Sequence, residues 1–182
     1  MPAATLDLMW TPTRLNDGKS VEYGFGWGLN KINGHDQVFH GGLLPGFRAH
    51  YARFPEVRLS IIVLANSDTV NTDVIALKLA ALHIDGLLPK RTPIRLSEST
   101  LDAYVGKYSW TPGLALAVTR KGEQLELQIP IGGQIFTLLP QSESVFFSLE
   151  HPLADFIFTK DAHGRVTRVD IPLGGYKAAR IE

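Results

Sequence analysis

Apolar residues alternate with polar residues or glycine over much of the chain, and this period of two is typical of β-strands. In the first half the alternation covers residues 23–29, 37–40 and 47–54. Residues 59–66, LSIIVLAN, are almost continuously apolar, which predicts a strand that is buried on both faces. Because short links join these segments, we expect them to be neighbours in an antiparallel sheet.

One segment of the first half has the spacing of a helix instead. Asn71 or Thr72 can cap its start, and Gly86 followed by Pro89 ends it. A first apolar stripe consists of Val74, Leu77, Ala81, Ile84 and Leu88, and a second one of Ile75, Leu79 and Leu82. A helix with two apolar stripes needs cover on more than one side, so we expect it to pack on the predicted sheet.

The second half contains only short strands and turns. Residues 115–130 predict a hairpin that turns at residues 121–123, and residues 161–164 predict another turn. Roughly eight strands follow one another, and closure into an up-and-down barrel would remove the free edges of such a meander. Two prolines and two positive charges in residues 88–93 are typical of an exposed linker.

These patterns predict an α+β chain in two parts. Residues 1–90 form a partial antiparallel sheet with a packed helix, residues 91–100 form a linker, and residues 101–182 form the barrel. The length of 182 residues suits one ordinary domain or two small ones.

The composition excludes several classes of function. With 18 Lys+Arg and 18 Asp+Glu the formal net charge is zero, which argues against nucleic acid or an acidic membrane surface as a partner. The chain has no cysteine, so disulfides and thiolate chemistry are excluded. No apolar run is long enough to cross a bilayer, and residues 1–5 lack the features of a signal peptide.

The stretch FHGGLLPGF, residues 39–47, carries the candidate chemistry. Glycines at the edge of a strand leave backbone N–H groups open to an incoming oxyanion. His40 could donate a hydrogen bond to a substrate carboxylate or tune a nearby base. The alternative is a tight turn with a surface histidine.

Four segments in order, YGFGWGL, FHGGLLPGFRAHYARFP, LSIIVLANSD and the apolar helix, carry a resemblance to a known family. This arrangement resembles the C-terminal third of the serine β-lactamase-like hydrolases, which include class C β-lactamases, penicillin-binding proteins, D-aminopeptidases and esterases. The segment LDAYVGKYSW with the following meander resembles the lipocalin-like barrel that some members carry. The resemblance covers nearly the whole chain.

The resemblance assigns roles to four residues. The third motif of the family, Lys-Thr-Gly or His-x-Gly, falls on His40, Gly41 and Gly42. The next residue, Leu43, is expected to supply an oxyanion-hole N–H, and His40 to bind the substrate carboxylate or support the catalytic hydrogen bonds. The implied substrates are small molecules, peptides or esters, the implied location is exported or periplasmic in a bacterium, and no cofactor is expected.

Two family motifs are missing from the sequence. No serine has a lysine three places on, as Ser-x-x-Lys requires, and no tyrosine has an asparagine two places on. No Gly-x-Ser-x-Gly elbow is present either. We therefore expect a C-terminal fragment that holds one wall of a hydrolase cleft, has no catalytic residue of its own and is inactive alone.

Other readings remain open. The chain could be a binding or regulatory protein whose barrel holds a small apolar ligand, or a subunit that complements a nucleophile-bearing chain. Candidate lining residues for such a barrel are Phe136, Phe146, Phe147, Phe156 and Phe158. A metal at His35, His40 and His50 is not expected, because His35 falls in a turn and no His-Glu-x-x-His helix exists.

Surface predictions follow from the expected truncation. Arg48 and His50 share a strand face that we expect to be solvated. Apolar surface is expected on Leu77, Leu79, Leu82, Ile84 and parts of residues 59–66. Exposed apolar patches tend to associate, so the sequence predicts homodimers or higher oligomers.

Overall fold

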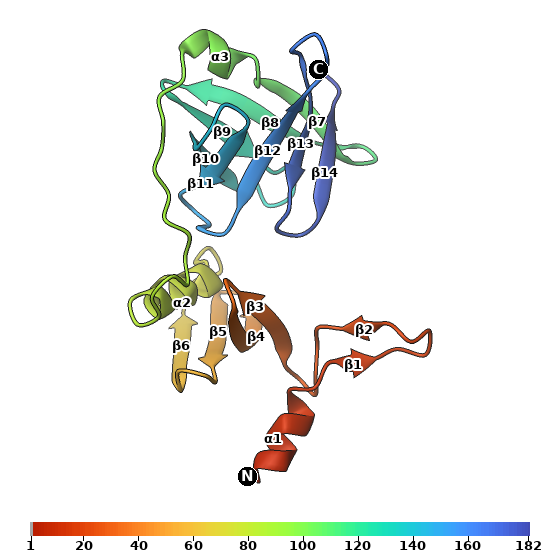
Figure 1. The fold of residues 1–182 in the computed structure, drawn as a ribbon, viewed down its shortest axis with the longest axis vertical. Coiled ribbons are helices and arrows are strands. Elements are labelled where there is room, and N and C mark those ends of the chain that lie inside the picture. The colour runs from red at the N-terminus through yellow and green to blue at the C-terminus, as the bar shows by residue number, and fades with distance from the viewer. Residues whose placement is uncertain (1) are drawn as a thin grey trace. The chain divides into compact units, whose positions relative to one another are not determined.

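The computed structural model describes residues 2–182 and divides the chain into two compact units (Figure 1). The first unit ends at Pro89, and the second runs from Lys90 to Glu182. The elements of the first unit are α1 (Ala3–Met9), β1 (Thr13–Arg14), β2 (Ser20–Val21), β3 (Gly28–Ile32), β4 (His35–Leu44), β5 (Phe47–Phe54), β6 (Leu59–Ala65) and α2 (Thr72–Ala81).

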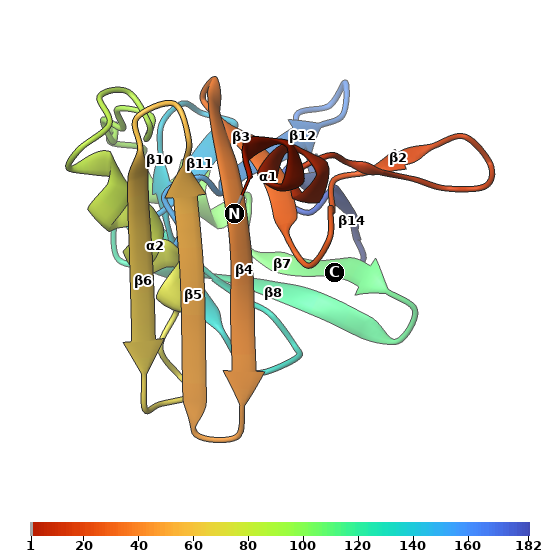
Figure 2. The ribbon, with the colours of Figure 1, turned by 90° about the horizontal axis from the view of Figure 1, so that it is seen from below.

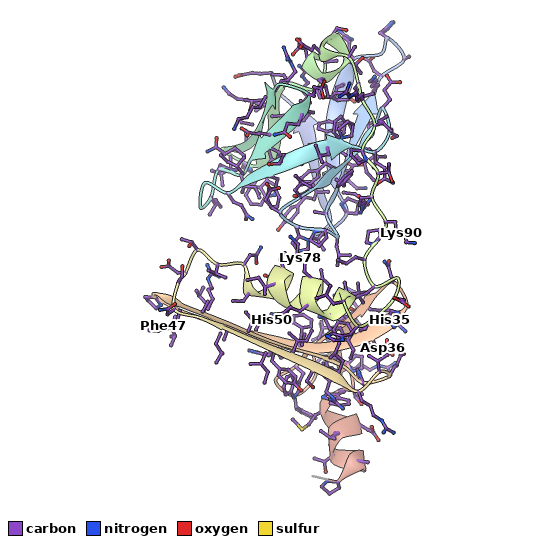
Figure 3. All side chains as sticks on the ribbon, turned by 90° about the vertical axis from the view of Figure 1, so that its left-hand side faces the viewer. His35, Asp36, Phe47, His50, Lys78 and Lys90 are labelled. Carbon is purple, nitrogen blue, oxygen red and sulfur yellow. The ribbon has the colours of Figure 1, made fainter. Side chains whose placement is uncertain are left out.

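An antiparallel sheet of order β3-β4-β5-β6 forms the centre of the first unit, as predicted. The helix α2 packs on β5 and β6, while α1 lies on the opposite side of the sheet (Figures 2 and 3). Ala52, Phe54 and Ile61 point to α2 and meet its buried stripe, which consists of Val74, Leu77 and Ala80. The strand β6 alternates instead of being buried on both faces, because Ile62 and Leu64 are exposed on the side away from α2.

The helix is shorter than predicted. It ends at Ala81, where the N–H groups of Leu82 and His83 bond carbonyls three residues back and tighten the last turn. Turns follow, yet Ile84 and Leu87 remain buried. Leu77 and Ile84 therefore do not contribute the exposed apolar surface that the sequence predicts, whereas Leu79 and Leu82 do.

Residues 23–29 do not form the predicted strand throughout. Only Tyr23 makes an isolated bridge to Gly28, where β3 begins, and the chain bends at Gly26 with φ +77°. The alternating glycines reflect close approaches instead. A Cβ on Gly24 would overlap the carbonyl oxygen of Met9, and one on Gly28 would lie 2.6 Å from the ring of Phe39.

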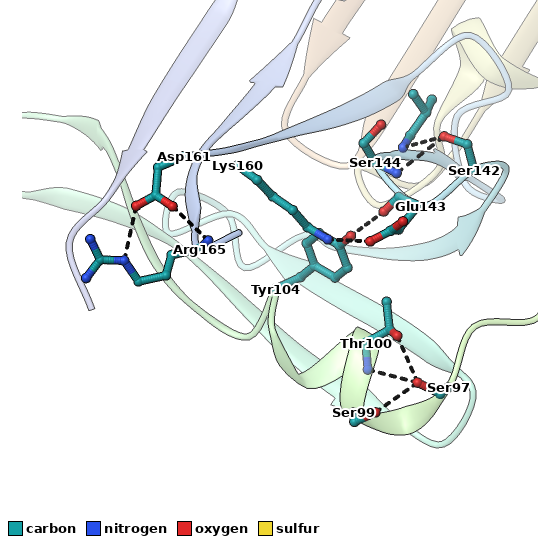
Figure 4. A network of polar contacts seen from close by, with 11 residues as sticks. Ser97, Ser99, Thr100, Tyr104, Ser142, Glu143, Ser144, Lys160, Asp161 and Arg165 are labelled. Atoms are coloured by element: carbon teal, nitrogen blue, oxygen red, sulfur yellow. Dashed lines mark hydrogen bonds and ion pairs between the residues drawn. The ribbon is translucent and has the colours of Figure 1, made fainter. Parts of the chain in front are cut away.

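The second unit is a closed barrel of eight strands, as predicted. A short helix α3 (Glu98–Asp102) precedes it, and Ser97 caps this helix by accepting from the N–H of Thr100 (Figure 4). The strands are β7 (Gly106–Thr111), β8 (Leu114–Lys121), β9 (Gln124–Gln128), β10 (Ile135–Pro140), β11 (Val145–Ser148), β12 (Asp155–Lys160), β13 (Val166–Ile171) and β14 (Tyr176–Arg180). Each pairs antiparallel with the next.

The barrel closes where β14 pairs with β7 over Ala179↔Ser109 and Arg180↔Tyr108. The guanidinium of Arg180 reinforces this seam by donating to the carbonyl oxygens of Ala103 and Val105, at 2.9 and 2.6 Å. Closure removes the free edges that an open meander would expose.

Side chains fill the α3 end of the barrel. Leu101 of α3 is fully buried, and the rings of Tyr104, Tyr108, Phe146 and Phe158 pack in edge-to-face or tilted pairs with centroids 4.9–5.8 Å apart. Tyr108 donates its hydroxyl to the carbonyl of Tyr104 at 2.7 Å. Nearby, the ammonium of Lys160 lies over the ring of Tyr104 and pairs with Glu143 at 2.6 Å (Figure 4).

Residues 90–97 run in extended conformation along the barrel. Arg91 pairs with Asp155 at 2.7 Å, donates to Gln141 at 2.7 Å and lies over the ring of Phe147. The N–H of Ile94 bonds the carbonyl of Pro140 at 2.8 Å. The segment predicted as a linker is thus bound to the second unit by specific contacts.

Candidate active-site strand

The hairpin of β4 and β5 positions the residues singled out in the sequence. Its turn consists of Pro45 and Gly46 alone, since Leu44 pairs directly with Phe47. Proline presets the backbone for the first turn position, and Gly46 adopts the positive φ, +78°, that the second position requires. The turn therefore fixes the register of both strands.

Residues 40–44 have a strand neighbour on one side only within the described part of the chain. The pairing of β3 with β4 stops at Gly28↔Phe39, because β3 begins there. The pairing with β5 continues to Leu44↔Phe47 at the turn. One backbone edge of residues 40–44 is therefore open to a ligand.

Gly41 and Leu43 carry the N–H groups that point to this open edge. Leu29 donates its N–H to the carbonyl of Glu22, in the segment before β3, so this N–H points away from β4. Alternate residues of an antiparallel strand face the partner strand, so Gly28, next to Leu29, exchanges hydrogen bonds with Phe39. Backbone N–H groups alternate in direction along a strand, so those of Gly41 and Leu43 share the direction of Phe39. These two donors can be reached by an incoming oxygen.

The two faces of the sheet separate the predicted side chains. Residues that pair directly across strands share a face. Gly41 pairs with His50, which lies between the sheet and α2 (Figure 3). His40 pairs with Tyr51 and therefore lies on the face away from α2. His40, Gly41, Gly42 and Leu43 thus lie along one edge of the strand, and His40 has the only polar side chain among these four.

Tyr23 is a neighbour of His40 that the sequence reasoning missed. Its hydroxyl lies 3.1 Å from Nε2 of His40, and the two rings meet edge to face. The chain after Tyr23 bends at Gly26, and the absence of a side chain at Gly24 lets the carbonyl of Met9 approach there. The alternation of aromatic residues and glycine in residues 23–28 is the only sequence signal that could have indicated this contact.

The two glycines after His40 are not required by the packing of this chain. A Cβ on Gly42 would meet the Cβ of Ala49 at 3.4 Å, and one on Gly41 would approach no described atom closer than 3.9 Å. Neither residue has a positive φ. Glycine inside a strand costs roughly 0.5–1 kcal/mol relative to alanine, and the packing of the described residues does not account for this cost at Gly41 and Gly42.

A cavity of about 540 Å³ adjoins the end of the hairpin. It is lined by Gly42, Leu43, Leu44, Phe47, Arg48, Ala49, Leu64, Ala65 and Asn66. Leu43 and Leu64 are strongly exposed, at 62% and 77%. The open edge at Leu43 therefore borders an apolar hollow large enough for a small organic molecule.

The predicted solvated face of β5 is covered instead. His50 is buried beneath α2 and stacks on Phe39 at 5.8 Å, while Nε of Arg48 donates to the carbonyl of Asp68 at 3.1 Å. Burial lowers the pKa of His50, Asp73 on α2 opposes the shift, and His40 adds to it. Burial thus favours the neutral form of His50 beneath the helix.

The three histidines weighed as metal ligands are dispersed. Nδ1 of His35 lies 3.6 Å from Glu56, His40 contacts Tyr23, and His50 stacks under α2. Among residues 2–182 no group of three or more potential ligands comes together. Within the same residues, no helix is both long and apolar enough to cross a membrane.

Known proteins match both units. Residues 3–85 match the family described as "Beta-lactamase", and residues 90–180 match the family described as "Domain of unknown function (DUF3471)". "Penicillin-binding protein 4*" of Bacillus subtilis (strain 168) is 34% identical over 154 residues, which are 79% of this chain and 34% of that protein. "D-aminopeptidase" of Gluconobacter oxydans (strain 621H) is 40% identical over 55 residues, 30% of this chain and 10% of that protein.

Two solved structures align with nearly the whole chain. "Structure of the octameric penicillin-binding protein homologue from Pyrococcus abyssi" covers 97% of this chain and 42% of that one, with 21% identity and a TM-score of 0.43. "Crystal structure of SurE with D-Leu" covers 100% and 44%, with 20% identity and a TM-score of 0.45.

The first unit is similar in sequence to β-lactamase-family and penicillin-binding proteins, and the second is a closed barrel. The chain belongs to the family described as "Domain of unknown function (DUF3471)", whose model matches half of its residues. It spans about a third of the length of its penicillin-binding relative and a tenth of that of the D-aminopeptidase.

Proposed function

We propose that the first unit supplies one wall of an acyl-transfer site for β-lactam, D-peptide or ester substrates. The N–H of Leu43 stabilises the oxyanion that develops when a nucleophile attacks the substrate carbonyl. His40 binds a substrate carboxylate or supports the catalytic hydrogen bonds. The nucleophile comes from residues outside these 182, since no serine here has a lysine three positions on.

The open edge of β4 carries this proposal. The N–H groups of Gly41 and Leu43 point away from β5, and β3 does not extend along this part of β4, because its pairing with β4 ends at Phe39. They lie on a strand whose register is fixed by a two-residue turn, so they need no rearrangement to meet a developing charge. The adjoining apolar hollow of about 540 Å³ can receive the rest of a substrate.

A first experiment tests the absence of a nucleophile. The purified chain is incubated with a fluorophosphonate and with a penicillin, and its intact mass is measured. We expect no covalent adduct, because the serines lack an activating lysine at the family spacing. An acyl adduct on any serine would overturn the proposal and locate a different active site.

A second experiment tests the wall itself. Residues 3–85 replace the matching segment of penicillin-binding protein 4*, and acylation by a labelled penicillin is measured in the chimera. Leu43→Pro removes the proposed donor, and proline is tolerated where the N–H points away from the partner strand. Loss of one oxyanion-hole donor costs roughly 10²- to 10³-fold in rate.

Leu43→Ala is the matched control, because it shortens the same side chain and keeps the N–H. We expect it to acylate within a few-fold of the parent chimera. If Leu43→Pro and Leu43→Ala acylate at the same rate, the N–H of Leu43 is not the donor, and the assignment fails.

A further inference from the structure

The two ends of the barrel differ in how they are filled. At one end α3 and the ring cluster around Tyr104 close the interior. At the other end lie the hairpin loops that join β7 to β8, β9 to β10, β11 to β12 and β13 to β14. We call this second end the loop end, and its residues are neither part of the candidate active-site strand nor of the first unit.

A cavity of about 150 Å³ lies inside the loop end. Of its ten lining residues, seven have purely hydrocarbon side chains, among them Leu116, Phe136, Ala154 and Phe156. Trp110 contributes the wall nearest β14 by packing edge to face against Tyr176, with centroids 5.4 Å apart. An apolar cavity of this volume accepts a molecule the size of benzene.

Further apolar side chains are exposed at the loop end. They are Ile131 between β9 and β10, Ile135 at the start of β10, Leu149 before β12 and Leu173 before β14, with Ile131 63% exposed. Isolated exposed apolar residues need no explanation, but these four lie at the same end of the barrel, and Leu173 also lines the cavity. The α3 end carries polar residues at the corresponding place, including the Ser97 cap and the Arg165–Asp161 ion pair (Figure 4).

Only part of the phenylalanine set that the sequence suggests contributes to this cavity. Phe136 and Phe156 line it, with centroids 5.8 Å apart. Phe146 and Phe158 fill the opposite end, and Phe147 lies outside the barrel beneath Arg91. The space therefore survives because the large rings are concentrated at one end of the interior.

We propose that the loop end binds the apolar end of a small neutral amphiphile, such as a short aliphatic chain that ends in a hydroxyl group. The chain enters the cavity, and the polar end stays at the mouth. With about 30 Å³ for each water-sized group, the cavity holds roughly five to six carbons. No Asp, Glu, Lys or Arg side chain lines the cavity, so a charged end would find no counter-charge there and would remain outside.

A chain-length series tests the proposal with the complete 182-residue chain. Primary n-alcohols of increasing length are titrated by calorimetry and by the fluorescence of Trp110, with Trp110→Phe identifying its signal against Trp10 and Trp27. We expect saturable binding that strengthens roughly fourfold for each added methylene until the cavity is full at about six carbons. The matching α,ω-diol of each length is the control ligand, because it would have to bury one hydroxyl without a partner.

Two variants change the cavity in opposite directions. Ala154→Leu fills it and is expected to abolish binding of the alcohols that fit the parent chain. Phe136→Ala enlarges it and is expected to move the length limit to longer alcohols. Leu82→Ala removes an equally apolar and more exposed side chain in the first unit and is expected to leave binding unchanged.

Binding that disappears in Ala154→Leu and shifts to longer chains in Phe136→Ala would establish the site. Circular dichroism and thermal unfolding confirm that each variant is folded before its alcohol binding is measured. Non-saturable binding to the parent chain would overturn the proposal, as would equal affinities for alcohols and diols. A length limit that is the same in Phe136→Ala and the parent chain would also overturn it. Failure of the acylation experiments leaves this test unaffected, because it involves only the second unit.

Discussion

Replacing Tyr108 by phenylalanine tests how dry the filled end of the barrel is. Tyr108 is fully buried and donates to the carbonyl of Tyr104 at 2.7 Å. Burial raises its pKa from 10.0 to about 12; Arg180 lowers it and Tyr104 raises it further. The unfolded chain ionises this tyrosine first, so the stabilising effect is complete below about pH 10 and is lost as pH rises toward about 12.

The magnitude follows from the shift. Two pKa units correspond to roughly 2.7 kcal/mol of unfolding free energy, of which about half is lost by about pH 11. At neutral pH the phenylalanine variant lacks one hydrogen bond, which is worth about 1 kcal/mol. The parent should therefore be the more stable protein at about pH 8 and lose that advantage by about pH 11.

Urea unfolding of the parent and of Tyr108→Phe across this range measures the effect, because all other alkaline titrations cancel in the difference. The tyrosinate absorbance of the parent minus that of the variant reports the ionisation of Tyr108 directly. A difference in unfolding free energy that stays constant with pH would refute the reasoning and mean that water reaches this hydroxyl.

Three further predictions concern other parts of the chain. The lowered pKa of His50 means that the unfolded chain binds the proton first, so the first unit should lose stability as pH falls below about 6.5. Thermal unfolding measured across this pH range should show a smaller loss in His50→Gln, and an unchanged acid dependence would contradict the prediction. Arg91→Ala leaves the half-buried Asp155 without its partner and should lower the unfolding free energy of the barrel by about 2 kcal/mol in urea titrations. A loss within about 0.5 kcal/mol would show that the pair behaves as a surface ion pair. The exposed apolar face of β6 should drive self-association, so Ile62→Lys with Leu64→Lys should shift the chain toward monomer in analytical ultracentrifugation; a parent chain that is already monomeric would be evidence against this interface.

The sequence predicts the barrel well because most of its strands alternate and five of its seven connections contain glycine, the exceptions being residues 141–144 and 149–154. It predicts the helix start but not its end, since Ile84 and Leu87 continue the apolar spacing after the helix has stopped at Ala81. Both remain buried in turns, and periodicity alone does not distinguish a buried turn from a buried helix face. Tertiary packing therefore determines where the helix ends.

For the candidate strand, too, the sequence predicts some features and not others. His40 to Leu43 are adjacent in sequence, so their common edge is predictable from a strand pattern. The contact of His40 with Tyr23 spans 17 positions and depends on a bend at Gly26, which a period of two hides. The cavity at the loop end depends on how the large rings are distributed between the two ends of the barrel. Alternation shows which residues point inward but not which end of the barrel each one fills.

The seam between β14 and β7 has a consequence for how the chain is made. The two strands that close the barrel are the first and the last of the unit, so their pairing joins residues about seventy positions apart. During synthesis β7 and β13 keep unpaired edges until β14 has left the ribosome, and such edges are sites of aggregation. Because Arg180 and the backbone of Glu182 complete the seam, removal of residues 176–182 would leave a seven-stranded sheet with two permanently exposed edges.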